Sequence, residues 1–155
     1  MTKLTFMMGE FEAEFPSDRL YATNHMWASP IAPTAPTNGG FRFGFTAYAV
    51  RLLQDVYFLD WNMDAPAQLS LRQLMGSIES KKAESELFAP VAGELKLFNS
   101  KLMSDPSMIN VDKYGEGWLF EMQAPEEGLL SAEAYLEHLA DVWEVTQRTI
   151  KGQLG

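Results

Sequence analysis

The clearest pattern of hydrophobic and polar positions in the chain lies between residues 76 and 93. An apolar position at Ile78 is followed by a polar stretch, and a second apolar segment runs from Leu87 to Val91. Two apolar segments separated by a few polar residues predict a β-hairpin with the polar stretch at its turn. The most basic point of this turn is the pair Lys81 and Lys82.

A lysine at an exposed turn is suited to modification rather than to catalysis. A catalytic amine needs desolvation to lower its pKa, and the small and acidic residues around Lys82 offer none. The same exposure leaves the amine within reach of an enzyme that modifies it. An ordinary solvated hairpin with two lysines is the alternative that the composition of this stretch leaves open.

Further strands are predicted where aromatic and β-branched residues cluster or alternate with polar ones. These segments are 41–45, 55–61, 94–98 and 118–122, and 55–61 is predicted to be a core strand. Thr46 is predicted to N-cap a short helix that ends at Leu53, with Tyr48 and Leu52 on its inner side. Asp105-Pro106 predicts the start of another helix, because proline is favoured at the first helical position.

The two ends of the chain have patterns of their own. Residues 1–18 are acidic and aromatic, so they form either an arm that packs through its phenylalanines or a partly ordered extension. Apolar residues at helical spacing predict one helix from Ser131 to Gln153, with Ser131 as its N-cap. Its apolar stripe consists of Tyr135, Leu136, Leu139, Val142, Trp143 and Ile150. The stripe favours packing on the rest of the protein, and a surface for a partner is the alternative.

Composition narrows the classes of function. A chain of 155 residues has the length of one domain, and its net charge of −9 argues against nucleic acid or an anionic membrane as a partner. We find no signal peptide and no apolar segment of transmembrane length, so we expect a cytoplasmic protein. Without cysteine the polypeptide has no thiol chemistry of its own, so an attached group must supply any thiol.

The sequence offers little for catalysis or metal binding. The two histidines, His25 and His138, lie far apart along the chain and no cysteine accompanies them, so no metal site is predicted. Neither a glycine-rich phosphate loop nor a nucleophile elbow is present. We therefore expect no catalytic residues, and a protein that is not an enzyme by itself.

The residues of the predicted hairpin resemble those of the glycine cleavage system H-protein family, whose members are lipoyl carriers. The matching positions are Glu79, Ser80, Lys82, Ala83, Ser85, Phe88, Ala89, Pro90, Val91 and Gly93. The resemblance implies that lipoate is attached to Lys82 and not to Lys81. It also implies that neighbours of Lys82 frame this lysine for the enzyme that attaches lipoate. Glu86 is implied to anchor the lipoyl-lysine arm at the surface. The framing residues are Glu79, Ser80, Ala83 and Ser85. Biotin carriers usually flank their lysine with methionine, which is absent here, so lipoate is implied rather than biotin.

A second motif supports the same resemblance. The chain has Asn99, followed after a gap by Tyr114-Gly-Glu-Gly-Trp-Leu119, and the family shows this pattern with proline in place of Lys113. The match to the family as a whole runs with gaps from Tyr21 to Met122. The implied fold is mainly β, a barrel-sandwich hybrid of the lipoyl and biotinyl carrier type with short helices and a C-terminal helix. We accordingly expect an N-terminal extension at 1–18, a lipoyl-type domain at 19–125 and a helix packed on it at 126–155.

The resemblance implies a carrier that shuttles an aminomethyl group between partner enzymes. Glycine decarboxylase would load the group, aminomethyltransferase would unload it, and dihydrolipoamide dehydrogenase would reoxidise the arm. A lipoate ligase or lipoyl transferase would attach the lipoate. The chain departs from the family at Met26, where an acid normally pairs with the carried amine. Two alternatives therefore stay open. One is an H-like lipoate-binding protein that carries sulfur for a heterodisulfide-reductase-like complex, and the other is an unmodified interaction module.

Overall fold

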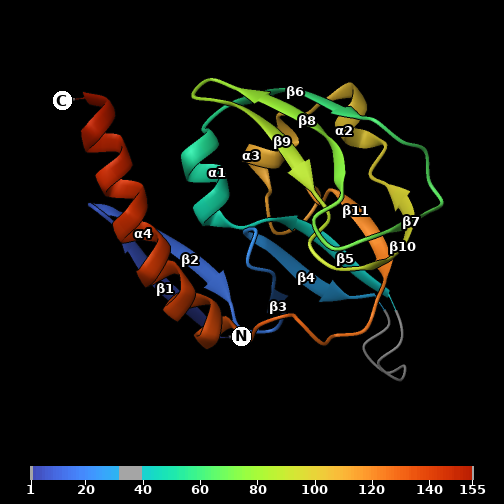
Figure 1. Ribbon diagram of the computed structural model, residues 1–155, viewed down its shortest axis with the longest axis horizontal. Helices are drawn as coiled ribbons and strands as arrows, with labels where there is room; N and C mark the ends of the chain where they lie inside the picture. The colour runs from blue at the N-terminus through green and yellow to red at the C-terminus, as the bar shows by residue number, and fades with distance from the viewer. Residues whose placement is uncertain (1, 32–39, 155) are drawn as a thin grey trace.

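Three antiparallel sheets make up most of the computed structural model, which describes residues 2–31 and 40–154 (Figure 1). The largest sheet contains, in spatial order, β3 (Leu20–Tyr21), β4 (Met26–Pro30), β5 (Gly40–Phe45), β11 (Phe120–Gln123), β10 (Gly93–Phe98) and β7 (Ala67–Leu69). A second sheet contains β6 (Val56–Trp61), β8 (Leu74–Ser80) and β9 (Glu84–Phe88). A separate pair consists of β1 (Lys3–Met8) and β2 (Phe11–Pro16).

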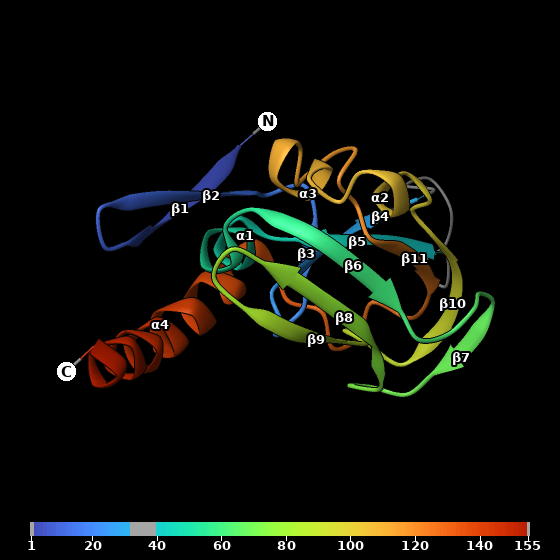
Figure 2. The same ribbon diagram turned by 90° about the horizontal axis from the view of Figure 1, so that it is seen from above.

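The six-stranded and three-stranded sheets pack face to face around one hydrophobic core (Figure 2). Phe43 of β5 stacks on Phe120 of β11, with ring centroids 5.5 Å apart, and both side chains are buried. From the other sheet, Met75 and Ile78 of β8 enter the same core. Two sheets that share an apolar layer in this way form a sandwich. The predicted fold class, a mainly β barrel-sandwich, is confirmed.

The strand β6 differs from the core strand predicted over 55–61. It lies at the edge of the three-stranded sheet and pairs only with β8 among the described strands, with a bulge between Val56 and Phe58. Val56 and Leu59 face the core, whereas Tyr57 is 62% exposed and Phe58 is 44% exposed. The prediction was wrong because a run of apolar residues does not reveal that a strand lies at an edge.

The helix α1 (Ala47–Leu53) follows β5, and the Thr46 side chain caps it by accepting a hydrogen bond from the backbone N–H of Ala49. Both the cap and the helix were predicted, and Tyr48 is buried as expected. Leu52 was predicted on the inner side, but it is 36% exposed and lines a surface cavity.

Two one-turn helices, α2 (Lys101–Ser104) and α3 (Met108–Val111), follow β10. The helix start predicted at Asp105-Pro106 is present as α3, whose N-cap is Ser107, so Pro106 lies just before the cap. Asp105 ends α2 with φ −148° and ψ 80°. A residue before proline avoids the helical conformation, so Pro106 belongs to the connection between the two helices.

The N-terminal hairpin and the C-terminal helix lie together on one side of the molecule (Figure 1). The helix α4 (Ala132–Leu154) begins after Ser131, whose Oγ accepts a hydrogen bond from the N–H of Ala134, as predicted for its N-cap. A second hydrophobic core joins α4, β2 and the first strand of the large sheet through Phe15, Tyr21 and Tyr135. Residues 3–16 thus form a hairpin that packs through Phe15 rather than a partly ordered extension.

The division into an extension, a lipoyl-type domain and a C-terminal helix stays a prediction. The proline-rich segment 29–40 is expected to form a loop, but its residues 32–39 lie outside the described residues. No described helix is both long and apolar enough to cross a membrane.

Candidate functional site

The predicted lysine hairpin is present as β8 and β9, which pair antiparallel up to Glu79 and Glu84. Ser80 closes the turn between them. Its Oγ donates a hydrogen bond to the carbonyl of Ala83 at 3.1 Å and accepts one from the N–H of Ala83 at 3.2 Å. The backbone N–H of Ser80 donates to the same carbonyl at 2.9 Å. The turn that carries Lys82 is therefore held by one side chain, that of Ser80, which is 4% exposed.

The hairpin tip is also fastened to the rest of the protein. The N–H of Lys81 donates a hydrogen bond to the carbonyl of Asp55 at 2.8 Å, so the tip lies beside the connection from α1 to β6. Both lysine side chains are exposed. The ion pairs among the described residues use other cations, namely Lys3, Arg19, Arg42, Lys96 and Lys101. A fixed backbone thus presents an accessible amine at Lys82.

A cavity of about 230 Å³ opens next to the lysine turn. Its walls come from the turn before β4, from α1 and from β9, and most of the residues that line it are apolar. Its lining includes the polar residues Asn24, His25, Ser85 and Glu86. It also includes Ala83, which follows Lys82 in the turn. Glu86 supplies the carboxylate among the described lining residues. The turn therefore places any long side chain that it carries beside a mostly apolar cavity.

The structure brings some of the predicted site residues to the cavity and leaves others elsewhere. Ala83, Ser85 and Glu86 line it. Ser80 acts in the turn, and Glu79 pairs with Phe58 on one side and Glu84 on the other, outside the cavity. The roles of these residues in the attachment of a prosthetic group stay predictions.

His25 is a cavity residue for which the sequence suggested no function. Its backbone has φ of 70°, a conformation that residues with a side chain seldom adopt. Its Nδ1 is 2.9 Å from the hydroxyl of Tyr135, which is in turn 3.0 Å from Oγ1 of Thr46. Burial and, to a smaller extent, the nearby His138 lower the pKa of His25 to about 4. The imidazole is therefore neutral at pH 7.

Asn24 is a second cavity residue that sequence reasoning missed. Its Nδ2 donates a hydrogen bond to the carbonyl of Phe88 at 3.1 Å, which ties the turn before β4 to β9. Its Oδ1 is sealed from solvent and has no hydrogen-bond partner among the described residues. A buried acceptor without a partner is uncommon in folded proteins.

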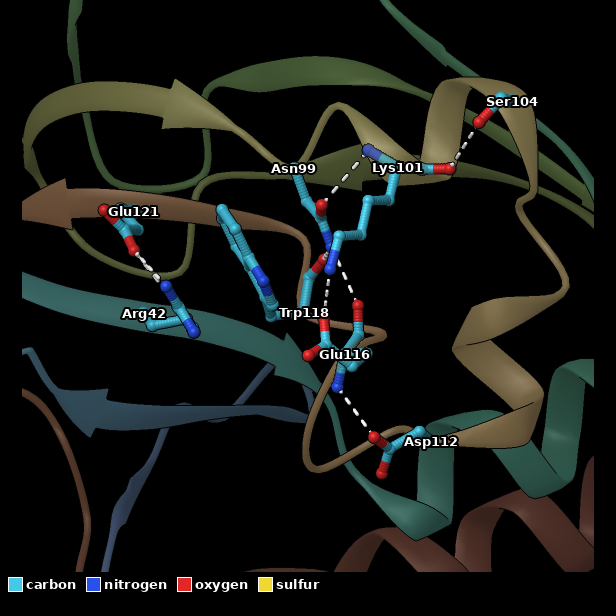
Figure 3. A network of polar contacts seen from close by, with 8 residues as sticks. All are labelled: Arg42, Asn99, Lys101, Ser104, Asp112, Glu116, Trp118 and Glu121. Atoms are coloured by element: carbon cyan, nitrogen blue, oxygen red, sulfur yellow. Dashed lines mark hydrogen bonds and ion pairs between the residues drawn. The ribbon is translucent and has the colours of Figure 1, made fainter.

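The second sequence motif builds the scaffold and not the cavity. Asn99 donates hydrogen bonds to the carbonyls of Glu116 and Trp118 at 2.9 and 2.8 Å (Figure 3). Asp112 accepts from the N–H of Glu116 at 2.8 Å, on the other side of the same turn. Gly117 is required there, because a Cβ would lie 2.6 Å from the carbonyl oxygen of Met108. None of these residues lines the cavity, so the motif stabilises the turn before β11.

Known proteins are similar to this chain in sequence and in fold. The sequence profile described as glycine cleavage H-protein matches residues 19–142. The glycine cleavage system H protein of Methylacidiphilum infernorum is 38% identical over 130 residues, which cover 81% of this chain and 96% of that protein. The H protein of Mycolicibacterium vanbaalenii is 36% identical, over 83% of this chain and 99% of that protein.

A solved structure agrees with these relatives. The crystal structure of a glycine cleavage system H protein from Mycobacterium marinum superposes with a TM-score of 0.69 and 36% sequence identity. The match covers 81% of this chain and 99% of that one. Together with the hairpin that presents Lys82, these similarities show that the chain belongs to the glycine cleavage H-protein family.

Proposed function

We propose that this member of a family of lipoyl carriers holds lipoate in amide linkage on Lys82 and moves a bound intermediate between partner enzymes. The exposed amine of Lys82, on a turn closed by Ser80 and beside an apolar cavity, carries the proposal. The amine is accessible to the lipoate ligase or lipoyl transferase. The cavity offers the attached arm a place to rest between visits to other proteins.

The cargo that fits the cavity is the aminomethyl group of glycine cleavage. Met26 is 2% exposed, lines the cavity and cannot pair with an amine. The carboxylate of Glu86, which lines the same cavity, can accept from an ammonium instead. This carboxylate supplies what the position of Met26 lacks, so we favour the aminomethyl group over a sulfur cargo.

The prosthetic group supplies the thiol chemistry that the cysteine-free polypeptide lacks, because a dithiolane cycles between disulfide and dithiol. The protein itself presents the arm, shelters it and docks. Glu79, Glu84 and Glu86 lie on the hairpin, and the net charge of the protein is −9. The partner surfaces that contact this hairpin are therefore expected to be positively charged. The partners are glycine decarboxylase, aminomethyltransferase and dihydrolipoamide dehydrogenase. Catalysis belongs to them.

The attachment site is tested by mass spectrometry of the intact protein after co-expression with a lipoate ligase. Wild type and Lys81→Arg are expected to gain one lipoyl group, because both retain Lys82. Lys81→Arg is the matched control, because Lys81 is the neighbouring lysine and is also exposed. Lys82→Arg is expected to gain none. An adduct on Lys82→Arg, or none on the wild type, overturns the proposed attachment and favours an unmodified interaction module.

The cargo is tested with the lipoylated protein and glycine decarboxylase. Loading of the arm with an aminomethyl group, measured as the corresponding mass increase in the presence of glycine, supports the proposed role. Glu86→Gln is expected to weaken retention of the group, because it removes the negative charge that attracts the ammonium. A lipoylated protein that glycine decarboxylase does not load contradicts the aminomethyl cargo and leaves the sulfur carrier as the better explanation.

A further inference from the structure

A buried row of three polar side chains joins the C-terminal helix to the wall of the cavity. Tyr135 of α4 stands between Thr46, at 3.0 Å, and Nδ1 of His25, at 2.9 Å. We propose that Tyr135 is a positioning residue that holds His25 in one tautomer, so that its Nε2–H donates a hydrogen bond to the thiolate of the reduced arm. The inference rests on the proposed function, because the arm is the lipoyl group on Lys82.

The direction of the hydrogen bonds follows from counting donors and acceptors. Thr46 is fully buried, and its Oγ1 already accepts from the N–H of Ala49. If Thr46 donates to the Tyr135 oxygen and Tyr135 donates to Nδ1 of His25, every hydroxyl proton has an acceptor. In the opposite direction, the hydroxyl proton of Thr46 has no acceptor among the described residues, which is unfavourable for a buried group.

The tautomer of His25 follows from this direction. An imidazole nitrogen that accepts a hydrogen bond carries no proton, so the single proton of the neutral ring lies on Nε2. The titratable groups that surround the ring are Tyr48 of α1 and Tyr135 and His138 of α4, with centroids 4.6, 5.9 and 5.9 Å away. Glu86 of β9 lines the same cavity. Burial lowers the pKa of His25 to about 4 and raises the pKa of Tyr135 well above its usual value of 10, so the imidazole and the phenol are both neutral at pH 7.

The Nε2–H of His25 is available to a ligand. It has no hydrogen-bond partner among the described residues, and it is not one of the two unpartnered side-chain atoms that are sealed there, Asn24 Oδ1 and Trp61 Nε1. His25 lines the cavity together with Ala83 and Ser85, which follow Lys82 in the chain.

The backbone fixes the donor in place, because the carbonyl of His25 accepts a hydrogen bond from the N–H of Thr46 at 3.0 Å. Thr46 thus holds the main chain of His25 directly and its ring through Tyr135. A fixed donor favours an anion over its neutral form, so it lowers the pKa of a thiol that binds there.

The positioning is tested first in the unmodified protein, by nitrogen-15 NMR of the imidazoles. In the wild type, His25 is expected to show its proton on Nε2, and Tyr135→Phe is expected to give a mixture of tautomers. Tyr48→Phe is the matched control, because Tyr48 contacts the same ring but its hydroxyl lies 3.2 Å from Thr146 Oγ1. A proton on Nδ1 in the wild type, or an unchanged tautomer in Tyr135→Phe, overturns the proposal.

The effect on the arm is tested in the lipoylated protein after reduction. The thiolate displaces iodide from iodoacetamide, so the alkylation rate at pH 7 follows the thiolate fraction. Tyr135→Phe and His25→Phe are expected to react about two- to tenfold more slowly, which corresponds to the net contribution of a typical hydrogen bond. His25→Gln retains an N–H donor and is expected to recover part of the rate, and Tyr48→Phe is expected to match the wild type.

The outcomes separate the two proposals. The mass of each protein is measured before reduction, and a missing lipoyl group overturns the proposed function. A protein that carries the group but alkylates equally fast in all variants overturns only the positioning role of Tyr135. Equal slowing in Tyr48→Phe and Tyr135→Phe also overturns it, because loosened packing around the ring then explains the rates.

Discussion

His25 combines an uncommon backbone conformation with a ring that is held on several sides. Left-handed φ values in residues other than glycine are unfavourable, and they persist where surrounding contacts enforce them. Here the hydrogen bond from Thr46 to the His25 carbonyl and the contact with Tyr135 provide that enforcement. The residue lies where a turn meets the cavity, so its conformation sets the shape of the cavity wall. Residues of this kind are more often part of a site than of a core alone.

The pKa of His25 gives the stability of the protein a pH dependence of definite sign. The pKa is about 4 in the folded protein and 6.5 for an unperturbed histidine, so the unfolded chain binds more protons between these values. The contribution of His25 to the free energy of unfolding is expected to be complete above pH 6.5 and lost as the pH falls to 4. Its size is at most about 3 kcal/mol.

Urea denaturation at about pH 7 and about pH 4.5, on either side of the pKa of an unperturbed histidine, measures this contribution, with His25→Gln as the comparison. Carboxylates titrate in both proteins, so the quantity of interest is the difference between the two pH dependences. The wild type is expected to lose more stability than the variant on acidification. Identical losses in both proteins would show that burial of His25 does not disfavour its charged form.

At the scale of elements, the β8–β9 hairpin was predictable because its signals are local. Its apolar segments and its polar turn are consecutive in the chain, and Thr46 likewise indicates the start of α1 within a few residues. The edge position of β6 was not predictable in this way, since it depends on which strands pair across the sheet. The same reason explains why the exposure of Tyr57 and Phe58 was missed.

The hairpin turn is expected to depend on the side chain of Ser80. Ser80→Ala removes the two hydrogen bonds with Ala83, so it is expected to lower the free energy of unfolding by about 1 kcal/mol and to slow attachment of lipoate. Chemical denaturation and the time course of lipoylation by mass spectrometry check both effects. Ser77→Ala is the control on the same strand. If both variants are lipoylated at the wild-type rate, the turn geometry does not matter to the attaching enzyme.

At the scale of the whole molecule, two cores meet at the turn that carries His25. The sandwich core was implied by the family resemblance, because the match to the family runs with gaps from Tyr21 to Met122. The second core depends on contacts over long distances in the chain, such as that between His25 and Tyr135, which are 110 positions apart. No local pattern predicts such a contact. For this reason the exposed hairpin lysine Lys82 was predicted from the sequence, whereas the places of Asn24 and His25 in the cavity wall required the structure.

The N-terminal hairpin lies outside the part of the chain that matches the family, yet it packs on the helix that holds His25. Phe15 contacts Tyr21 and Tyr135 edge to face, with centroids 6.2 and 5.6 Å away, and it is fully buried. Phe15→Ala is therefore expected to lower the free energy of unfolding by about 3–5 kcal/mol. It is also expected to broaden or shift the imidazole resonances of His25, because Tyr135 loses the packing that holds it. Met7→Ala, at an exposed position of β1, is expected to change neither measurement. A destabilised Phe15→Ala with unchanged His25 resonances would show that the hairpin supports α4 without reaching the cavity.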